Sequence, residues 1–140
     1  MKKQVFLDSD VILDLLINRH PFFNESQKIF DLAETNQILL FSSTLVLANI
    51  YYVLCRLSNK NKAFDSIVRI KTIVKLLSVT EKSINGAIAL KFRDFEDAIQ
   101  YFVAFENKMD IFITRNIKDF PADGLKIMVP GEFLLNLKHL

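Results

Sequence analysis

Carboxylate and amide side chains follow two short apolar runs, and they are the residues of this chain best suited to chemistry. Asp8 comes directly after the apolar residues 5–7, and Asn116 and Asp119 follow the apolar residues 111–113. A carboxylate placed directly after a buried strand is costly unless it is paired or bound to a metal. Asp8 is therefore the first candidate functional residue of the chain.

A second pair of carboxylates opens a predicted helix. Asp94 and Asp97 lie one helical turn apart, and the apolar residues after Asp97 predict that its side chain points toward the edge of a sheet. The helix leads into the apolar run 111–113. This pair and Asp8 can therefore meet where ligands bind in parallel sheets, outside the carboxyl ends of the strands.

A cluster of this kind would need a cation, because like charges held close together repel and raise each other's pKa values. Its ligands would all be oxygens, with no His or Cys nearby in the sequence, which favours Mg²⁺ or Mn²⁺ over zinc. Such an ion could orient a phosphate and lower the pKa of an attacking water molecule. The pattern therefore predicts metal-dependent phosphate chemistry at one edge of a sheet.

Several of these side chains also have structural interpretations. Ser9 and Asp10 are common N-cap residues, and we interpret Asp10 as a helix cap rather than a ligand. Asp94 and Glu96 stand at a helix start, where negative charge complements the helix dipole. A purely structural role for Asp94 therefore stays open beside the functional one.

Short apolar runs alternate with helical patterns along the whole chain. The expected strands span residues 5–7, 38–41, 76–79, 111–113 and 127–129. Helical patterns follow residue 10 and cover about residues 24–34, 45–57, 62–75, 81–90, 93–107 and 130–137. Wholly apolar strands that alternate with helices favour a parallel sheet covered on both faces. We therefore predict one α/β domain over residues 1–140, a three-layer α/β/α sandwich around a parallel sheet of about five strands.

The composition excludes several classes of protein. The 140 residues are 51% apolar and 24% charged, and a net charge of +2 is too small to indicate nucleic acid or membrane binding by itself. A single cysteine excludes an internal disulfide framework and a Cys-rich zinc site. No apolar run reaches the ~18 residues of a membrane span, and Asp8 ends the first run too early for a signal peptide. We expect a soluble, cytoplasmic protein with no membrane partner.

Taken together, the acidic segments resemble the PIN domain, the fold of VapC-type toxins and related nucleases. The ordered set is specific and spans essentially the whole chain. The segments that carry the resemblance are Phe6-Leu7-Asp8-Ser9-Asp10-Val11-Ile12-Leu13-Asp14-Leu15, Asp94-Phe95-Glu96-Asp97-Ala98-Ile99-Gln100, Ile113-Thr114-Arg115-Asn116-Ile117-Lys118-Asp119-Phe120 and Val129-Pro130-Gly131-Glu132-Phe133-Leu134.

The resemblance implies a cluster of acidic residues that binds one or two Mg²⁺ or Mn²⁺ ions and hydrolyses RNA. Asp8 matches the family's first acidic position and Asp97 the third. Asn116 matches the fourth, where relatives carry Asp or Asn, and Asp119 follows three residues later. Thr114 would support the site through its hydroxyl group. The implied protein is an endoribonuclease, the toxin of a toxin–antitoxin pair, which forms a homodimer and whose antitoxin covers the acidic cleft.

The family's second acidic position has no acidic counterpart in this chain. It lies on the helix that matches residues 45–57, and that stretch contains no Asp or Glu. Asn49 is the best candidate for the position, although an amide coordinates a metal through its oxygen without adding charge, so metal affinity should fall. The metal ligands that the resemblance implies are therefore Asp8, Asp94, Asp97, Asn116 and Asn49.

Two other functions stay open at this point. With a weakened metal site, the protein could be a PIN-fold module that binds RNA or a partner without catalysis. The segment at residues 7–11 is also similar to the start of haloacid-dehalogenase-type phosphatases, with Asp8 as nucleophile and Asp10 as general acid. The short chain and the lack of that family's later motifs argue against a phosphatase. Arg115 is a candidate to offset phosphate charge.

Overall fold

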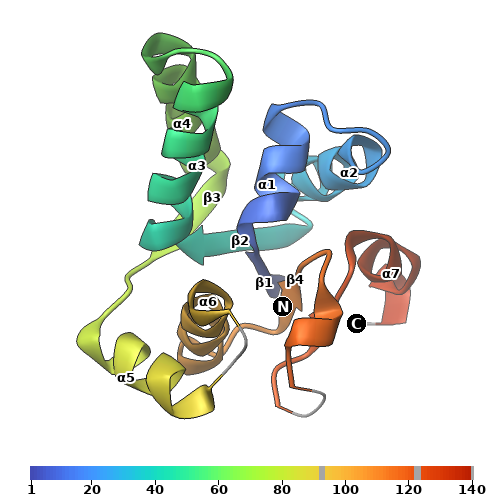
Figure 1. Ribbon diagram of the computed structural model, residues 1–140. Coiled ribbons are helices and arrows are strands. Elements are labelled where there is room, and N and C mark those ends of the chain that lie inside the picture. The colour runs from blue at the N-terminus through green and yellow to red at the C-terminus, as the bar shows by residue number, and fades with distance from the viewer. Residues whose placement is uncertain (92–93, 122–123, 140) are drawn as a thin grey trace.

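The computed structural model describes residues 1–91, 94–121 and 124–139 as strands and helices that alternate along the chain (Figure 1). The strands are β1 (Lys3–Leu7), β2 (Ile38–Ser43), β3 (Val74–Leu77), β4 (Ile111–Ile113) and β5 (Ile127–Met128). The α-helices are α1 (Ser9–Leu16), α2 (Phe23–Glu34), α3 (Thr44–Leu57), α4 (Lys60–Ile73), α5 (Glu81–Leu90), α6 (Phe95–Glu106) and α7 (Pro130–Leu135). Two short 3₁₀ helices, η1 (Ile117–Asp119) and η2 (Leu137–His139), follow β4 and α7.

The five strands run parallel in one sheet, in the order β3-β2-β1-β4-β5. The first strand of the chain, β1, therefore lies at the centre, between β2 and β4. Leu7 at the end of β1 is level with Ile113 at the end of β4. The residues that follow these two strands, Asp8 and Thr114, consequently leave the sheet side by side at the same edge.

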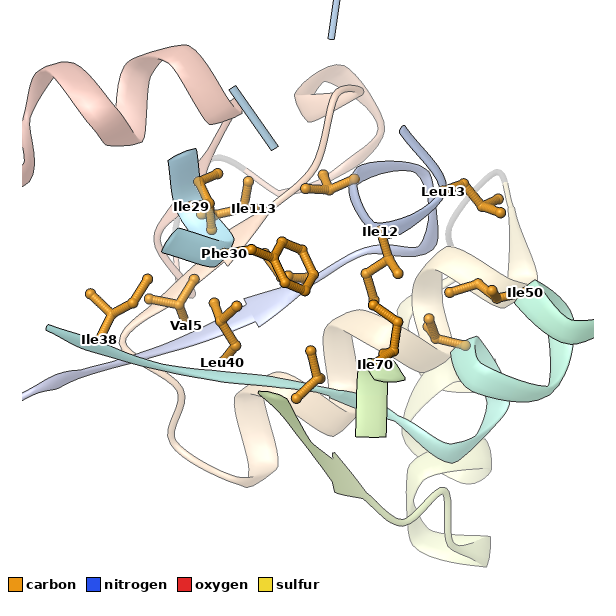
Figure 2. Packing of buried hydrophobic residues seen from close by; sticks show 14 of the residues in the cluster. Val5, Ile12, Leu13, Ile29, Phe30, Ile38, Leu40, Ile50, Ile70 and Ile113 are labelled. Atoms are coloured by element: carbon orange, nitrogen blue, oxygen red, sulfur yellow. The ribbon is translucent and has the colours of Figure 1, made fainter. Parts of the chain in front are cut away.

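Helices cover both faces of the sheet, and Figure 1 shows α1 to α4 on one side of β2 and α5 and α6 on the other. Successive side chains of β1 point to opposite faces, so Val5 and Leu7 lie in one core and Phe6 lies in the other. Helices α1, α2, α3, α4 and α7 cover the first core. Figure 2 shows Ile12 of α1 and Phe30 of α2 in this core, together with Val5 of the sheet.

The second core is built from aromatic rings and small helical residues. Phe6 and Phe112, from neighbouring strands, stack with their ring centroids 5.1 Å apart. Gly86 on α5 lies against the ring of Phe102 on α6, where a side chain at residue 86 would collide with that ring. The close packing of α5 on α6 therefore helps to hold α6 in place, and this helix carries Asp97 in its first turn, with Asp94 as its cap.

The predicted α/β sandwich is confirmed, and the elements differ from expectation mainly in their limits. The prediction of the third strand at residues 76–79 is wrong by two residues, because Val74 is buried and pairs with Leu40. The exposed Lys75 interrupts the apolar run on this edge strand and hides its true start. Arg93, expected at the start of the acidic helix, lies outside the described residues. Among the described residues, no helix is both long and apolar enough to span a bilayer.

Candidate functional site

Asp8 is buried where β1 ends and α1 begins, and only 7% of the residue is exposed. Its Oδ1 atom accepts a hydrogen bond from the backbone N–H of Ser9 at 2.8 Å, and its Oδ2 atom accepts one from Thr114 Oγ1 at 2.9 Å. Burial, followed by the carboxylates of Asp10 and Asp97, raises the pKa of Asp8 to about 7. The two hydrogen bonds oppose this rise, because they stabilise the ionised form.

The interpretation of Asp10 as the cap of α1 is wrong, because Asp8 holds that position by accepting the bond from Ser9. Asp10 lies in the first turn of α1 and faces Arg115 in the segment after β4. The backbone N–H of Arg115 donates to Asp10 Oδ2 at 3.3 Å, and its Nε atom lies 3.8 Å from the same oxygen. The boundary of α1 thus frees Asp10 to form an ion pair.

Arg115 also pairs with a carboxylate deeper in the molecule. Its Nε atom lies 3.1 Å from Oδ2 of Asp14, whose side chain is fully buried, and Arg19 Nη1 lies 3.3 Å from Asp14 Oδ1. Its guanidinium carbon lies 4.1 Å from the centre of the Phe22 ring. Burial raises the pKa of Asp14, whereas Arg115 and then Arg19 lower it. Arg115 therefore already neutralises carboxylates, and a role in offsetting phosphate charge would compete with these pairs.

Asp97 lies half-buried in the first turn of α6, and Asp94 caps that helix by accepting the N–H of Asp97 on Oδ1 at 3.0 Å. The pKa of Asp97 is raised to about 6, chiefly by burial and then by the carboxylates of Asp94 and Asp119. Asp10 and Glu96 raise the same pKa further. Carboxylates from α1, α6 and the segment after β4 therefore act on one another at this edge.

A buried polar contact holds α6 against the end of β2. Ser43, the last residue of β2, donates its hydroxyl to Gln100 Oε1 at 2.5 Å. The same hydroxyl caps α3 by accepting the N–H of Val46 at 3.0 Å. Gln100 lies three residues after Asp97 and hence on the same side of α6. This contact consequently fixes the position of Asp97 at the edge of the sheet.

Asn116 and Asp119 lie in the segment that follows β4. The backbone N–H of Asn116 donates to Thr114 Oγ1 at 3.3 Å, and its side-chain Nδ2 donates to Asp119 Oδ2. The hydroxyl of Thr114 therefore accepts from Asn116 and donates to Asp8. These bonds connect the expected residues of the β1 and β4 ends, and Asp97 interacts with them through charge.

Asn49 lies half-buried on α3, and its neighbour across the helix interface is Glu96. Its side-chain Nδ2 donates to Glu96 Oε1 at 2.5 Å. We expect Asn49 to coordinate a metal through its oxygen, whereas this contact uses its nitrogen to hold a carboxylate.

Sequence reasoning missed a role for Glu96 in this contact and also missed Asp14. Asp14 follows Asp10 by four residues, and that helical spacing places both on one face, which is a signal that could have revealed the pair. Glu96 has no comparable signal, because its partner Asn49 lies on another helix and is 47 residues away in the chain.

The donor atoms at this edge suit a hard cation. Among the side chains that the structure describes, in residues 1–91, 94–121 and 124–138, no three His, Cys, Asp or Glu group closely enough to hold a metal by themselves. Mg²⁺, however, commonly keeps several waters and binds through one or two carboxylates. Asp8 and Asp97 carry raised pKa values, and neither forms an ion pair with a described Lys or Arg. The residues present therefore fit Mg²⁺ or Mn²⁺.

Asp8, Asp10, Asp97 and Asp119 lie together at the carboxyl ends of β1 and β4, and we call this cluster the acidic edge. The fold and the acidic edge together define a PIN domain. The family model described as the PIN domain matches residues 4–118 of this chain. The chain therefore belongs to the PIN domain family. This assignment replaces the haloacid-dehalogenase alternative, whose general acid would have been Asp10, a residue that is instead paired with Arg115.

The relatives within this family are similar over most of their length. Ribonuclease VapC1 of Aquifex aeolicus is 26% identical over 136 residues, which cover 94% of this chain and 93% of that protein. The structure of VapBC2 from Rickettsia felis, bound to a DNA fragment from its promoter, matches with a TM-score of 0.73 at 16% identity and covers 90% and 98% of the two chains. A toxin–antitoxin complex from Klebsiella pneumoniae matches with a TM-score of 0.67 at 17% identity and covers 90% and 97%.

Proposed function

We propose that this protein is a metal-dependent endoribonuclease that uses Mg²⁺ or Mn²⁺ at the edge formed by β1, β4 and α6. The observation that carries the proposal is the buried carboxylate of Asp8, whose pKa is raised by burial and by the charges of Asp10 and Asp97, while neither Asp8 nor Asp97 has a basic partner among the described residues. A bound Mg²⁺ or Mn²⁺ would stabilise charge on a phosphate and lower the pKa of an attacking water. RNA as substrate is supported by the activity named for the Aquifex aeolicus relative.

The residues of the chain have distinct tasks in this proposal. Asp8 and Asp97 bind the cation, and Asn116 adds an amide oxygen to the same edge. Thr114 orients the Asp8 carboxylate by donating a hydrogen bond to its Oδ2 atom. Asp119 accepts a hydrogen bond from Nδ2 of Asn116, and this contact directs the amide oxygen of Asn116 to the other side. Preorganised ligands of this kind lower the free-energy cost of binding the cation.

The proposal is tested with purified protein and a structured RNA in Mg²⁺, in Mn²⁺ and in chelator. Cleavage should require a divalent ion. Asp8→Asn or Asp97→Asn should lower the cleavage rate by at least about a hundredfold, because the loss of a metal ligand removes most of the rate enhancement that the metal provides. Asp65→Asn, which changes an exposed carboxylate on α4, is the matched control and should cleave like the wild type. Cleavage that persists in chelator, or in both site variants, would refute the proposal.

We further propose that the protein is the toxin of a toxin–antitoxin pair and binds an antitoxin. The solved toxin–antitoxin complex from Klebsiella pneumoniae supports this assignment at the level of fold. Helices α3 and α4 also expose large apolar side chains that suit a protein partner. They are Tyr52, Leu57, Phe64 and Val68, which are 65%, 61%, 60% and 49% exposed.

The partner surface is tested by substitution. Phe64→Ser and Val68→Ser should weaken binding of a co-expressed antitoxin while leaving the melting temperature nearly unchanged, because both side chains are exposed. Ile88→Ser on α5 removes an equally exposed apolar side chain and serves as the control. Equal loss of binding in all three variants would contradict the assignment of this surface. A homodimer stays a prediction, which sedimentation analysis of the purified protein checks.

A further inference from the structure

Helix α3 has no acidic residue, but its Asn49 contacts a carboxylate on α6, that of Glu96, which lies beside the acidic edge. Asn49 donates from Nδ2 to Glu96 Oε1 at 2.5 Å. A side-chain amide binds a cation through its oxygen, so this nitrogen contact positions a carboxylate and is not itself a coordination bond. Glu96 Oε2 accepts no hydrogen bond from any residue that the structure describes. One oxygen of Glu96 is therefore held, and the other is available.

Glu96 lies next to the site on its own helix as well. It directly precedes Asp97 in the first turn of α6, and its carboxylate is close enough to act on that of Asp97. The Glu96 side chain is exposed, so its second oxygen can meet a hydrated cation at little desolvation cost while the first stays bound to Asn49. The buried contact of Gln100 with Ser43 fixes α6, and with it the point from which the Glu96 side chain extends.

We propose that Glu96, held by Asn49 across the α3–α6 interface, is a cation ligand of the acidic edge and supplies a carboxylate where α3 has none. Asn49 is then a positioning residue that acts through Glu96. This inference rests on the proposed function, because it concerns the same cation. Water-mediated contact with the cation would serve equally, since Mg²⁺ and Mn²⁺ keep part of their hydration shell in proteins.

The test measures Mn²⁺ binding itself, by calorimetry and by the rise in melting temperature that Mn²⁺ produces. Glu96→Gln should lower Mn²⁺ affinity about tenfold, as loss of an outer carboxylate does at other metal sites. Its melting temperature in chelator should match the wild type within about 2 °C. Glu81→Gln removes an exposed acid from the first turn of α5 and is the matched control, which should bind Mn²⁺ like the wild type.

A double-mutant cycle separates positioning from a merely structural role. Asn49→Ala should lower Mn²⁺ affinity less than Glu96→Gln does, and it should have no further effect once Glu96→Gln is present. A purely structural Asn49 would instead lower the affinity equally in both backgrounds, and this result would overturn its assignment as a positioning residue.

The failure of this inference differs from the failure of the proposed function. If Glu96→Gln binds Mn²⁺ like the wild type while Asp97→Asn loses binding, Glu96 is not a ligand and the proposed function stands. If the wild type itself binds no Mn²⁺ at millimolar concentration, both proposals are wrong.

Discussion

Two groups of carboxylates flank the end of β1, and they differ in what neutralises them. Asp10 and Asp14 on α1 face Arg115, and Arg19 adds a second cation to Asp14. The charge of Asp97 acts on Asp8, further carboxylates act on both residues, and neither forms an ion pair with a basic side chain among the described residues. Both groups are buried or half-buried, so burial alone does not distinguish them.

The difference separates carboxylates that stabilise the fold from carboxylates that suit a ligand. Arg115 lies in the segment after β4, and its pairs with α1 tie that segment to the centre of the molecule. The first group therefore has cations of its own within the protein. The second group has unbalanced negative charge, which a cation would offset. The following predictions test this division, beginning with the largest expected effect.

Removing the arginine of the paired group should cost the most stability. Arg115→Met leaves the fully buried Asp14 with Arg19 as its remaining ion-pair partner. Breaking a buried pair from one side costs about 3 kcal/mol of unfolding free energy, because the remaining charge is poorly solvated. Urea denaturation measures the loss, and adding Asp14→Asn should recover part of it. A loss below about 0.5 kcal/mol would show that the pairing does not define this group.

The unpaired group should make the metal-free protein less stable as the pH rises. The pKa of Asp8 is about 7 in the folded protein, against an ordinary value of 3.8. Between these values the folded state binds a proton that the unfolded state lacks, so the unfolding free energy falls with increasing pH. We expect a fall of about 2 kcal/mol from pH 5 to pH 7 in chelator. A rise over this interval, after subtraction of the Asp8→Asn profile, would contradict the shift.

Asp8→Asn should relieve repulsion rather than weaken the fold. Asparagine keeps an oxygen for the N–H of Ser9 and can donate to the hydroxyl of Thr114, so both local contacts can persist. In chelator at pH 7.5 the unfolding free energy should be unchanged or raised by about 1 kcal/mol, and the melting temperature should no longer respond to Mn²⁺. A clear loss of stability in chelator would instead mark Asp8 as a structural hydrogen-bonding residue.

The ion pair between α5 and α6, in which the lysine is largely exposed, should show the smallest effect and serves as a reference for the others. Lys82 Nζ lies 3.6 Å from Glu106 Oε2, and the Lys82 side chain is 77% exposed, whereas the Glu106 side chain is 26% exposed and its Oε2 atom is buried. Lys82→Met should lower the unfolding free energy by about 1 kcal/mol or less, because the lysine is largely solvated and its nitrogen lies 3.6 Å from the carboxylate. If Lys82→Met destabilises as much as Arg115→Met, burial does not separate the two kinds of pair.

The sequence was sufficient for most of the fold because its signals are local. Apolar runs such as residues 111–113 are buried on both faces, and side chains such as Ser43 mark helix starts. The carboxylates at strand ends followed from the same reasoning, since a parallel sheet gathers those ends at one edge. The third strand failed because the exposed Lys75 of an edge strand breaks the pattern on which the prediction depended.

The partners of the site residues could not be predicted, because they depend on contacts distant in the chain. A shift of two residues in the cap of α1, from Asp10 to Asp8, left Asp10 as the ion-pair partner of Arg115. Asn49 was identified by its residue type alone, and its contact with Glu96 depends on how α3 packs against α6. Such pairings follow from tertiary packing, for which a single sequence has no periodic signal.

The central position of β1 has a consequence for synthesis of the chain. Asp8 and its hydrogen-bonding partner Thr114 are 106 residues apart, and β4 must add to the open side of β1 before they can meet. While a ribosome makes the chain, β1 can pair early with β2, but its other edge stays exposed until residues 111–113 emerge. A nascent chain that stops before β4 therefore contains Asp8 but cannot assemble the carboxylate edge around it.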